Sequence, residues 1–269
     1  MFVSEKIVFI QLQKTGCTHI AKLLSNLLEG RHIGKHNRAT PELFTNQRSF
    51  LGSIRDPWEW YVSLWAYGCD KKGRIYQRVT KRKGDLRGRE WSNNPLDAAY
   101  SLLNDFSRNT DRWKRSYSDV NDASGFRDWL YMIHDKSYWN DFGEGYGSCP
   151  TTKVAGLLTY RYLKLFCRDN FNHILSFSDL KEFEKSNCYI DHFIRNENLE
   201  EDLVRALNLC GINISETQKN TIYYSSKTNT SSKKNKISYY YDNEMINLVN
   251  DRERFIIDKF VYKIGRAHV

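Results

Sequence analysis

Hydrophobic positions near the N-terminus change from the period of a strand to the period of a helix. The continuous apolar run Ile7–Ile10 is typical of a buried strand. After a short loop, the run from His19 to Leu28 places apolar residues at helical spacing, and we expect Gly30 to stop this helix. The pattern therefore predicts a strand, a loop and a helix in succession.

The same order repeats before residue 70. A second apolar run ends at Ile54, and a helix is predicted from Pro57, the favoured residue for a first helical position. Asp56 suits the N-cap, Glu59 is placed to complete a capping box, and Gly68 is expected to end the helix. Alternating strands and helices predict an α/β fold with a parallel sheet, whose ligands bind at the carboxyl ends of the strands.

Beyond residue 70 the pattern is mainly helical. Helices are predicted over 95–108, 124–134, 152–167, 198–209 and 240–262, short strands over 173–177 and 189–194, and polar loops over 141–150 and 224–238. Gly211 should stop the fourth of these helices. At 269 residues, one domain over 1–263 is expected. The last six residues, 264–269, match what a common sequencing-adapter oligonucleotide encodes, so we interpret them as an artefact.

Composition narrows the class of protein. Forty per cent hydrophobic and 27% charged residues are typical of a soluble globular chain, and no apolar run approaches the roughly 20 residues that span a bilayer. The N-terminus lacks the organisation of a signal peptide. Six scattered cysteines form no Cys-x-x-Cys pair, which argues against zinc and favours reduced thiols and a cytoplasmic location.

Positive charge is concentrated in one segment. Residues 71–89 hold nine basic side chains against Asp85, giving +8 of a formal net charge of +9. Such a run is either a solvated loop or a surface that attracts a polyanion. We interpret 71–150, which is also rich in aromatic residues, as a helical, loop-rich insertion that meets the acceptor.

The segment from Lys14 to Thr18 has the chemistry of a phosphate site. Between a strand and a helix, backbone N–H groups and the helix dipole favour an anion, and Gly16 allows its close approach. Thr15 and Thr18 add hydroxyl donors, Cys17 lies between them, and Lys14 adds a positive charge. An ordinary strand–turn–helix with a surface lysine is the alternative.

A second anion site is predicted where the next strand ends. Arg55 sits beside a helix N-terminus, and Ser63 lies two turns into that helix on much the same face as Asp56. A well-capped helix with a solvated arginine is the alternative.

Together, the two segments resemble sulfotransferases that use 3′-phosphoadenylyl sulfate (PAPS), and the style of the motifs is that of the carbohydrate and heparan-type O-sulfotransferases. In that family a Lys-Thr-Gly-x-Thr type loop holds the 5′ phosphosulfate, matching Lys14 to Thr18 here. An Arg-Asp-Pro segment with a Ser eight residues after the Arg holds the 3′ phosphate, matching Arg55 and Ser63. Residues 191–199 and 240–262 resemble late segments of the family, whereas Gln13 replaces its usual Pro.

The resemblance implies a P-loop-type, three-layer α/β/α fold with a central parallel sheet. It also implies transfer of a sulfuryl group from PAPS to a hydroxyl or amine, with 3′-phosphoadenosine 5′-phosphate (PAP) as product and no metal. Lys14 would stabilise the leaving group. The acceptor would be a small molecule or a glycan, and an anionic one if the basic run binds it; no nucleic acid partner is expected.

A general base must accept the proton of the acceptor, and His36 is the candidate. Heparan-type enzymes place a catalytic His with a Thr four residues later in the corresponding stretch, and His36 and Thr40 have that spacing. His32 is the nearest rival, and Glu42 is a carboxylate alternative. His19 is more typical of a helix-surface or phosphate-loop residue.

Two other functions fit parts of the sequence. A P-loop kinase-like phosphotransferase would need Gly-x-x-x-x-Gly-Lys-[Ser/Thr], but Lys14 precedes Gly16 and that pattern is absent. It would also need a metal-binding Asp after an apolar strand, for which Asp179 is the weak candidate. A non-catalytic, basic polyanion-binding protein would explain the basic run. It would not require Lys14, Arg55 and Ser63 at the positions they have beside the two predicted helix starts.

Overall fold

The computed structural model describes residues 1–44, 47–81, 108–226 and 235–264. Most of the predicted helix over 95–108 and the part of the basic run after Lys81 lie outside these residues. The final residues assigned to an adapter also lie outside them, apart from Ile264.

A five-stranded sheet carries the fold, in the order β3-β1-β2-β4-β5. Its strands are β1 (Phe2–Ser4), β2 (Ile7–Ile10), β3 (Gly30–His32), β4 (Ser49–Ile54) and β5 (His192–Arg195). The strands β2, β4 and β5 are parallel, whereas β1 runs antiparallel to both β2 and β3. The α/β class is confirmed, but the expected parallel sheet is mixed because two short N-terminal strands extend one edge.

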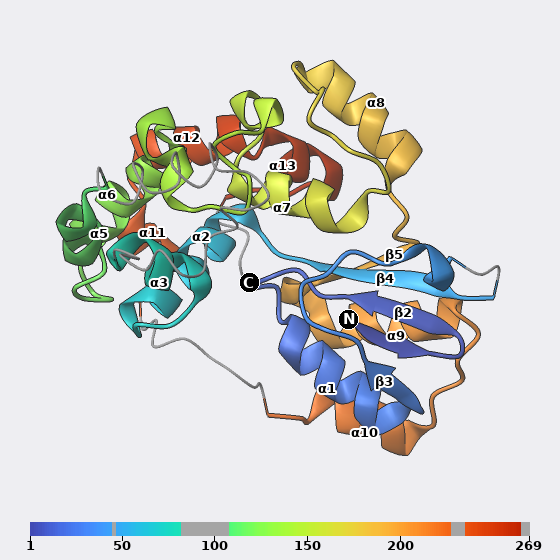
Figure 1. Cartoon of the computed structure of the whole chain (residues 1–269). Helices are drawn as coiled ribbons and strands as arrows, with labels where there is room; N and C mark the ends of the chain where they lie inside the picture. Colours follow the sequence, from blue (N-terminus) through green and yellow to red (C-terminus); the bar gives the residue numbers. More distant parts are fainter. Residues whose placement is uncertain (45–46, 82–107, 227–234, 265–269) are drawn as a thin grey trace, which may run out of the picture.

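Helices cover both faces of the sheet (Figure 1). Because side chains alternate along a strand, Ile7 and Phe9 of β2 pack with α1 (Cys17–Leu27), α9 (Leu199–Leu209) and α10 (Glu216–Tyr223). Val8 and Ile10 point to the other face, where a larger cluster includes α2 (Pro57–Cys69) and α7 (Leu157–Phe166). The described chain is therefore layered as helix, sheet and helix.

The larger helical layer is built from helices of both halves of the chain. Its further helices are α3 (Arg74–Thr80), α5 (Thr110–Ser116), α6 (Ala123–His134), α8 (Phe177–Asn187), α11 (Ile237–Tyr240), α12 (Asn243–Arg252) and α13 (Arg254–Phe260). Short 3₁₀ helices lie at Pro41–Leu43, Lys136–Asp141, Pro150–Lys153 and Asn196–Asn198. The large aromatic side chains Trp113, Phe126, Trp129 and Tyr146 are buried here, so they form core and no acceptor surface.

Several predicted boundaries are confirmed and others are wrong. The helices predicted over 124–134 and 198–209 form as α6 and α9, and Gly211 follows α9 with φ 67°. Gly30 does not stop α1 but begins β3, and Gly68 lies inside α2, where a Cβ would collide with the ring of Tyr117. The strand predicted over 173–177 is absent from this described stretch, because Ser176 caps the start of α8. Asp179 is therefore an exposed residue of a first helical turn.

The helices predicted over 152–167 and 240–262 are both interrupted where Glu253 contacts the start of α7. The carboxylate of Glu253, between α12 and α13, accepts hydrogen bonds from Leu158 N (3.0 Å) and Thr159 N (2.9 Å) at the start of α7. Burial raises the pKa of this carboxyl group, and the Tyr61 hydroxyl also donates to it. Gly156, the N-cap of α7, leaves room for the Glu253 carboxylate, since a Cβ there would collide with it. The capping of one helix thus breaks both long helices.

Candidate functional site

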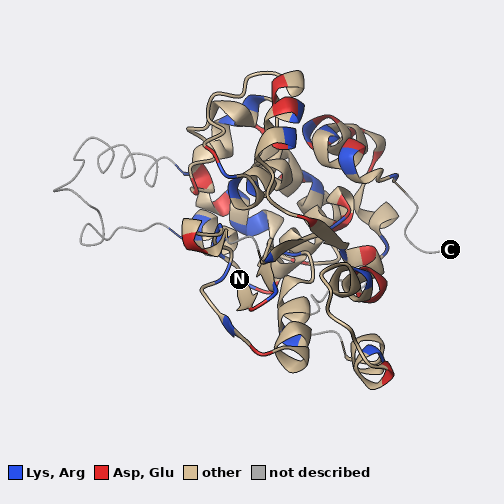
Figure 2. Cartoon of the chain, turned by 90° about the vertical axis from the view of Figure 1, so that its right-hand side faces the viewer, with Lys and Arg blue, Asp and Glu red and all other residues tan. Residues whose placement is uncertain are grey.

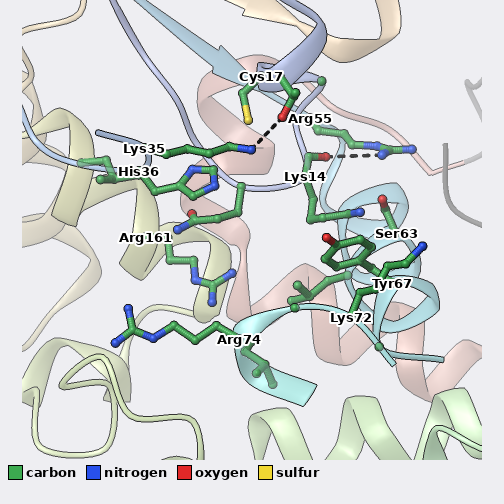
Figure 3. A pocket seen from close by; sticks show the side chains of 18 of the residues that line it. Lys14, Cys17, Lys35, His36, Arg55, Ser63, Tyr67, Lys72, Arg74 and Arg161 are labelled. Atoms are coloured by element: carbon green, nitrogen blue, oxygen red, sulfur yellow. Dashed lines mark hydrogen bonds between the residues drawn. The ribbon is translucent and has the colours of Figure 1, made fainter. Parts of the chain in front are cut away.

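A pocket of about 820 Å³ lies at the carboxyl ends of β2 and β4 (Figure 3). The Lys14 loop, the start of α1, the Arg55 segment, α2, α3 and α7 all line it. Its described lining contains seven Lys and Arg side chains against the single carboxylate of Glu144; the cations are Lys14, Lys35, Arg55, Lys72, Arg74, Arg161 and Lys164. Elsewhere, basic and acidic residues are mixed over the helices (Figure 2). The positive charge of this lining favours an anionic ligand.

Gly16 fixes the turn between β2 and α1. It is the N-cap of α1 in the left-handed region, at φ 74°. A Cβ there would lie 2.7 Å from Asn196 Nδ2 and 2.8 Å from Leu199 Cδ1, so both side chains would have to move, and the positive φ itself favours glycine. The first turn of α1 has no side-chain cap and no acidic residue. Its N–H groups and the helix dipole therefore favour an anion at the place the sequence predicts.

The two threonines of this loop have different roles. Thr15 is buried, and its hydroxyl donates to Leu12 O (2.8 Å), so the 2.6 Å contact with Ser53 Oγ has Ser53 as donor. This hydroxyl ties the loop to β4 and does not line the pocket, contrary to its predicted role as a donor to the ligand. Thr18 does line the pocket, together with Cys17, and accepts a hydrogen bond from Lys35 Nζ at 3.0 Å.

Lys14 is held in an uncommon conformation at the centre of the pocket. Its backbone is left-handed, at φ 63°, and its Nζ lies 4.1 Å from the centroid of the Tyr67 ring. Trp60 of α2 holds the preceding residue through a 2.7 Å hydrogen bond from Nε1 to Gln13 O. Burial, and then the charge of Arg55, lower the pKa of Lys14 to about 8. The ammonium group is thus charged at neutral pH but poorly compensated, which favours a bound anion.

Arg55 and Ser63 reach the same pocket from β4 and α2. Arg55 donates to Glu59 Oε2 (2.8 Å) and to Lys14 O (3.4 Å), and its Nε is buried without a partner. Ser63 is buried on α2 and points into the pocket beside Lys14. The guanidinium of Arg55 and the hydroxyl of Ser63 thus line the same part of the pocket, where they could bind a second anionic group.

The capping of α2 differs in part from the prediction. Asp56 accepts a hydrogen bond from Glu59 N at 3.0 Å, as expected for an N-cap. The reciprocal half of the predicted capping box is wrong, because Glu59 pairs with Arg55 and the N–H of Asp56 donates to Glu197 Oε1 at 2.8 Å. Burial raises the pKa of Asp56 to about 7. The segment after β5 therefore contacts both predicted anion sites. Asn196 lies against Gly16, and Glu197 accepts the hydrogen bond from the N–H of Asp56.

His36 lies in the pocket in the form that a general base requires. Its Nδ1 is 2.8 Å from Gln11 O, and a carbonyl only accepts, so Nδ1 carries the proton and Nε2 carries the lone pair. Burial lowers the pKa of the imidazole, which keeps the ring neutral at pH 7. Like Lys14, it has a left-handed backbone, at φ 58°. In Figure 3 it lies beside Lys35 and Arg161, on the opposite side from Lys14.

The other candidates for the general base lie in different surroundings from His36. His32 is an exposed residue of β3 whose Nε2 is 2.8 Å from Ser25 Oγ, and it is absent from the described pocket lining. Glu42 is fully exposed in a 3₁₀ helix, and Thr40 before it is exposed as well. His19 lines the pocket, with Nε2 3.2 Å from Ser225 Oγ. Of the three predicted bases, His36 alone lines the described pocket.

Besides Lys35, sequence reasoning missed three charged residues on the His36 side of the pocket, namely Glu144, Arg161 and Lys164. Arg161 of α7 has a 4% exposed side chain that pairs with Glu144 at 3.0 Å and packs over the Trp60 ring. Lys164, one turn later, donates to Glu144 O at 2.6 Å. Burial alone would raise the pKa of Glu144, but Arg161, Lys164 and Arg74 hold it below its usual value. This end of the pocket thus carries more positive charge than its carboxylate neutralises.

No family model, curated protein or solved structure matches this chain. Within residues 1–44, 47–81, 108–226 and 235–264, no cluster of His, Cys, Asp and Glu is placed to hold a metal ion. Over the same residues, no helix has the length and apolar character needed to cross a membrane.

Proposed function

We propose that this protein is a PAPS-dependent sulfotransferase with a P-loop-type fold. The observation that carries the proposal is the meeting of three predicted groups in one pocket: the Lys14 loop, the Arg55–Ser63 pair and His36. These groups come from three separate segments, and each is suited to one part of the reaction. A cytoplasmic location stays a prediction.

The two anion sites fit the two charged ends of PAPS. The uncapped start of α1, with Lys14, Thr18 and Lys35, would hold the 5′ phosphosulfate. The guanidinium of Arg55, which lines the pocket, would hold the 3′ phosphate together with Ser63. When bound, PAPS supplies the sulfuryl group and an adenosine bisphosphate leaving group.

The side chains on the two sides of the pocket have complementary roles in transfer. His36 Nε2 accepts the proton of the acceptor hydroxyl or amine, while Nδ1–H stays fixed on Gln11 O. Lys14 neutralises the charge that develops on the leaving side. Because fixed cations do this, we expect no requirement for a metal.

The charge balance near His36 supports an anionic acceptor, of which a carbohydrate acid is our first choice and another small molecule the second. Arg161, Lys164 and Arg74 surround Glu144 and leave an excess of positive charge. An acceptor carboxylate or sulfate placed there would satisfy that excess and bring a neighbouring hydroxyl toward His36.

Cofactor selectivity gives the direct test of this function. We expect PAP to bind about ten- to a hundredfold more tightly than ADP, because a charged phosphate contact contributes about 1.5–3 kcal/mol. Calorimetry on the same protein sample measures both affinities. Ser63→Ala should reduce the preference for PAP over ADP. Ser25→Ala, on α1 outside the pocket lining, should leave that preference unchanged. Equal affinities for PAP and ADP would exclude the proposal.

Two alternative functions predict other results. A kinase-like phosphotransferase would prefer ATP and lose all activity in excess EDTA until Mg²⁺ is restored, whereas we expect sulfuryl transfer to persist. A non-catalytic polyanion-binding protein would bind a sulfated polysaccharide without selectivity for PAP. We favour neither, because neither explains the paired anion sites beside a neutral histidine.

The pH dependence of PAP binding should follow Lys14. Anion binding favours the ammonium form, so the complex takes up a proton once the pH exceeds the free-protein pKa of about 8. We therefore expect PAP affinity to be steady near pH 7 and to fall by up to about tenfold per pH unit above 8. Calorimetry in buffers of different ionisation enthalpy measures the proton uptake. Lys14→Arg should remove that uptake, and an unchanged uptake in this variant would assign it to another group.

A further inference from the structure

Cys167 and Cys188 face each other directly across a two-residue antiparallel bridge. Each follows the last residue of a helix, Cys167 after α7 and Cys188 after α8. The residues beside them make the flanking hydrogen bonds, Arg168 N to Asn187 O and Tyr189 N to Phe166 O, both 3.0 Å. The cysteines are therefore the non-hydrogen-bonded pair of the bridge, the arrangement that brings Cα atoms to about 4.5 Å with both side chains on one face.

This backbone arrangement suits a disulfide. A Cα separation of about 4.4–6.8 Å accommodates the bond without movement of the chain. Both thiols are free in the structure. Cys167 is buried, whereas Cys188 is half-buried and lies 3.5 Å from the Tyr162 hydroxyl. Cys149 differs, since its thiol donates to Asn172 Oδ1 at 3.2 Å, and it serves as a control.

We propose that Cys167 and Cys188 form a disulfide that joins the end of α7 to the segment that leads into β5. With glutathione disulfide as the oxidant, the more accessible Cys188 thiolate attacks one glutathione sulfur and releases one glutathione. The Cys167 thiolate then attacks the Cys188 sulfur of the mixed disulfide and releases the second glutathione. The two thiol protons leave with the two glutathiones, so two thiols are oxidised and one disulfide is reduced.

The bond should form most readily while the chain folds. Burial raises the pKa of both thiols, so the reactive thiolate is scarce once the structure is complete. After closure, residues 167–188 form a covalent loop that contains α8 and fixes the end of the helix that carries Arg161 and Lys164. For a loop of this length, we expect the disulfide to raise the Tm by roughly 5–10 °C.

Peptide mapping after refolding tests the proposal. The reduced, unfolded protein is refolded in a mixture of reduced and oxidised glutathione, its remaining thiols are blocked, and it is digested with trypsin without reduction. We expect the peptide 165–168 to be linked to the peptide 186–195. Treatment of the refolded protein with a phosphine reductant should lower the Tm by the same 5–10 °C.

Variants identify the pair and need no assumption about sulfuryl transfer. Cys188→Ser should abolish both the linked peptide and the effect of reductant on the Tm, whereas Cys149→Ser should keep both. Absence of the linked peptide at every glutathione ratio, an equal yield of links to other cysteines, or a Tm insensitive to reductant would each overturn the proposal. If Cys188→Ser fails to fold, the peptide map of the wild-type protein and the effect of reductant on its Tm still test the proposal.

Discussion

Lys14→Ala should lower kcat by at least about a hundredfold in a sulfuryl-transfer assay, the usual scale for the loss of one group that stabilises developing charge. The Nζ of Lys14 lies in the pocket beside Tyr67, and the Lys14 carbonyl accepts a hydrogen bond from Arg55. The assay would use whichever acceptor gives the highest turnover in a panel of glycans, phenols and amines. Because the side chain points into the pocket and forms no core, the Tm should stay close to that of the wild type.

A matched control separates the role of Lys14 from a general loss of positive charge. Lys22→Ala removes the same side chain from the exposed side of α1, and it should leave kcat unchanged. PAP affinity should fall in Lys14→Ala but not in Lys22→Ala. Near-normal turnover of Lys14→Ala would show that another cation, such as Lys35, stabilises the leaving group.

The turn before α1 and the start of α2 could be predicted because the information that determines them is local. Gly16, Asp56 and Pro57 determine the backbone through their own conformational preferences, and the nearby Lys14 and Arg55 then share one end of the sheet. The position of the pocket follows from the order of strands and helices alone. Local reasoning therefore succeeded for the turn between β2 and α1 and for the N-terminus of α2.

Tertiary contacts decided the features that sequence reasoning missed. Glu197 replaces Glu59 at the Asp56 N–H because the segment after β5 packs beside α2, about 140 residues away in the chain. Glu253 breaks two helices by capping a third, which no helical periodicity can reveal. Arg161 lies on a helix whose apolar pattern indicates only core, and its pairing with Glu144 depends on the loop between them.

The strands β1 and β3 were missed for a different reason. The three-residue strands β1 and β3 are too short to show a period of two, and their pairing is determined by the neighbouring strand. Their presence changes the sheet from parallel to mixed. It leaves the site unchanged, because the pocket lies at the ends of the parallel strands β2 and β4.

His36→Ala should lower kcat by about a hundred- to ten-thousandfold, the range expected for a general base, with acceptor KM and PAP affinity little changed. The wild-type rate should rise with pH through the lowered pKa of His36, because only the neutral ring accepts a proton. The variant should lose that rise, and added imidazole should restore part of its activity.

The rivals of His36 supply the controls for this experiment. His32→Ala removes the same ring from β3, and Glu42→Gln removes an exposed carboxylate; both should keep wild-type kcat and its pH dependence.

The hydrogen bond from His36 Nδ1–H to Gln11 O adds a further expectation, since it fixes which nitrogen accepts the proton. His36→Gln should therefore be as inactive as His36→Ala, because an amide side chain can replace that hydrogen bond but is not a base. A wild-type rate for His36→Ala together with a loss in His32→Ala would move the general base to β3.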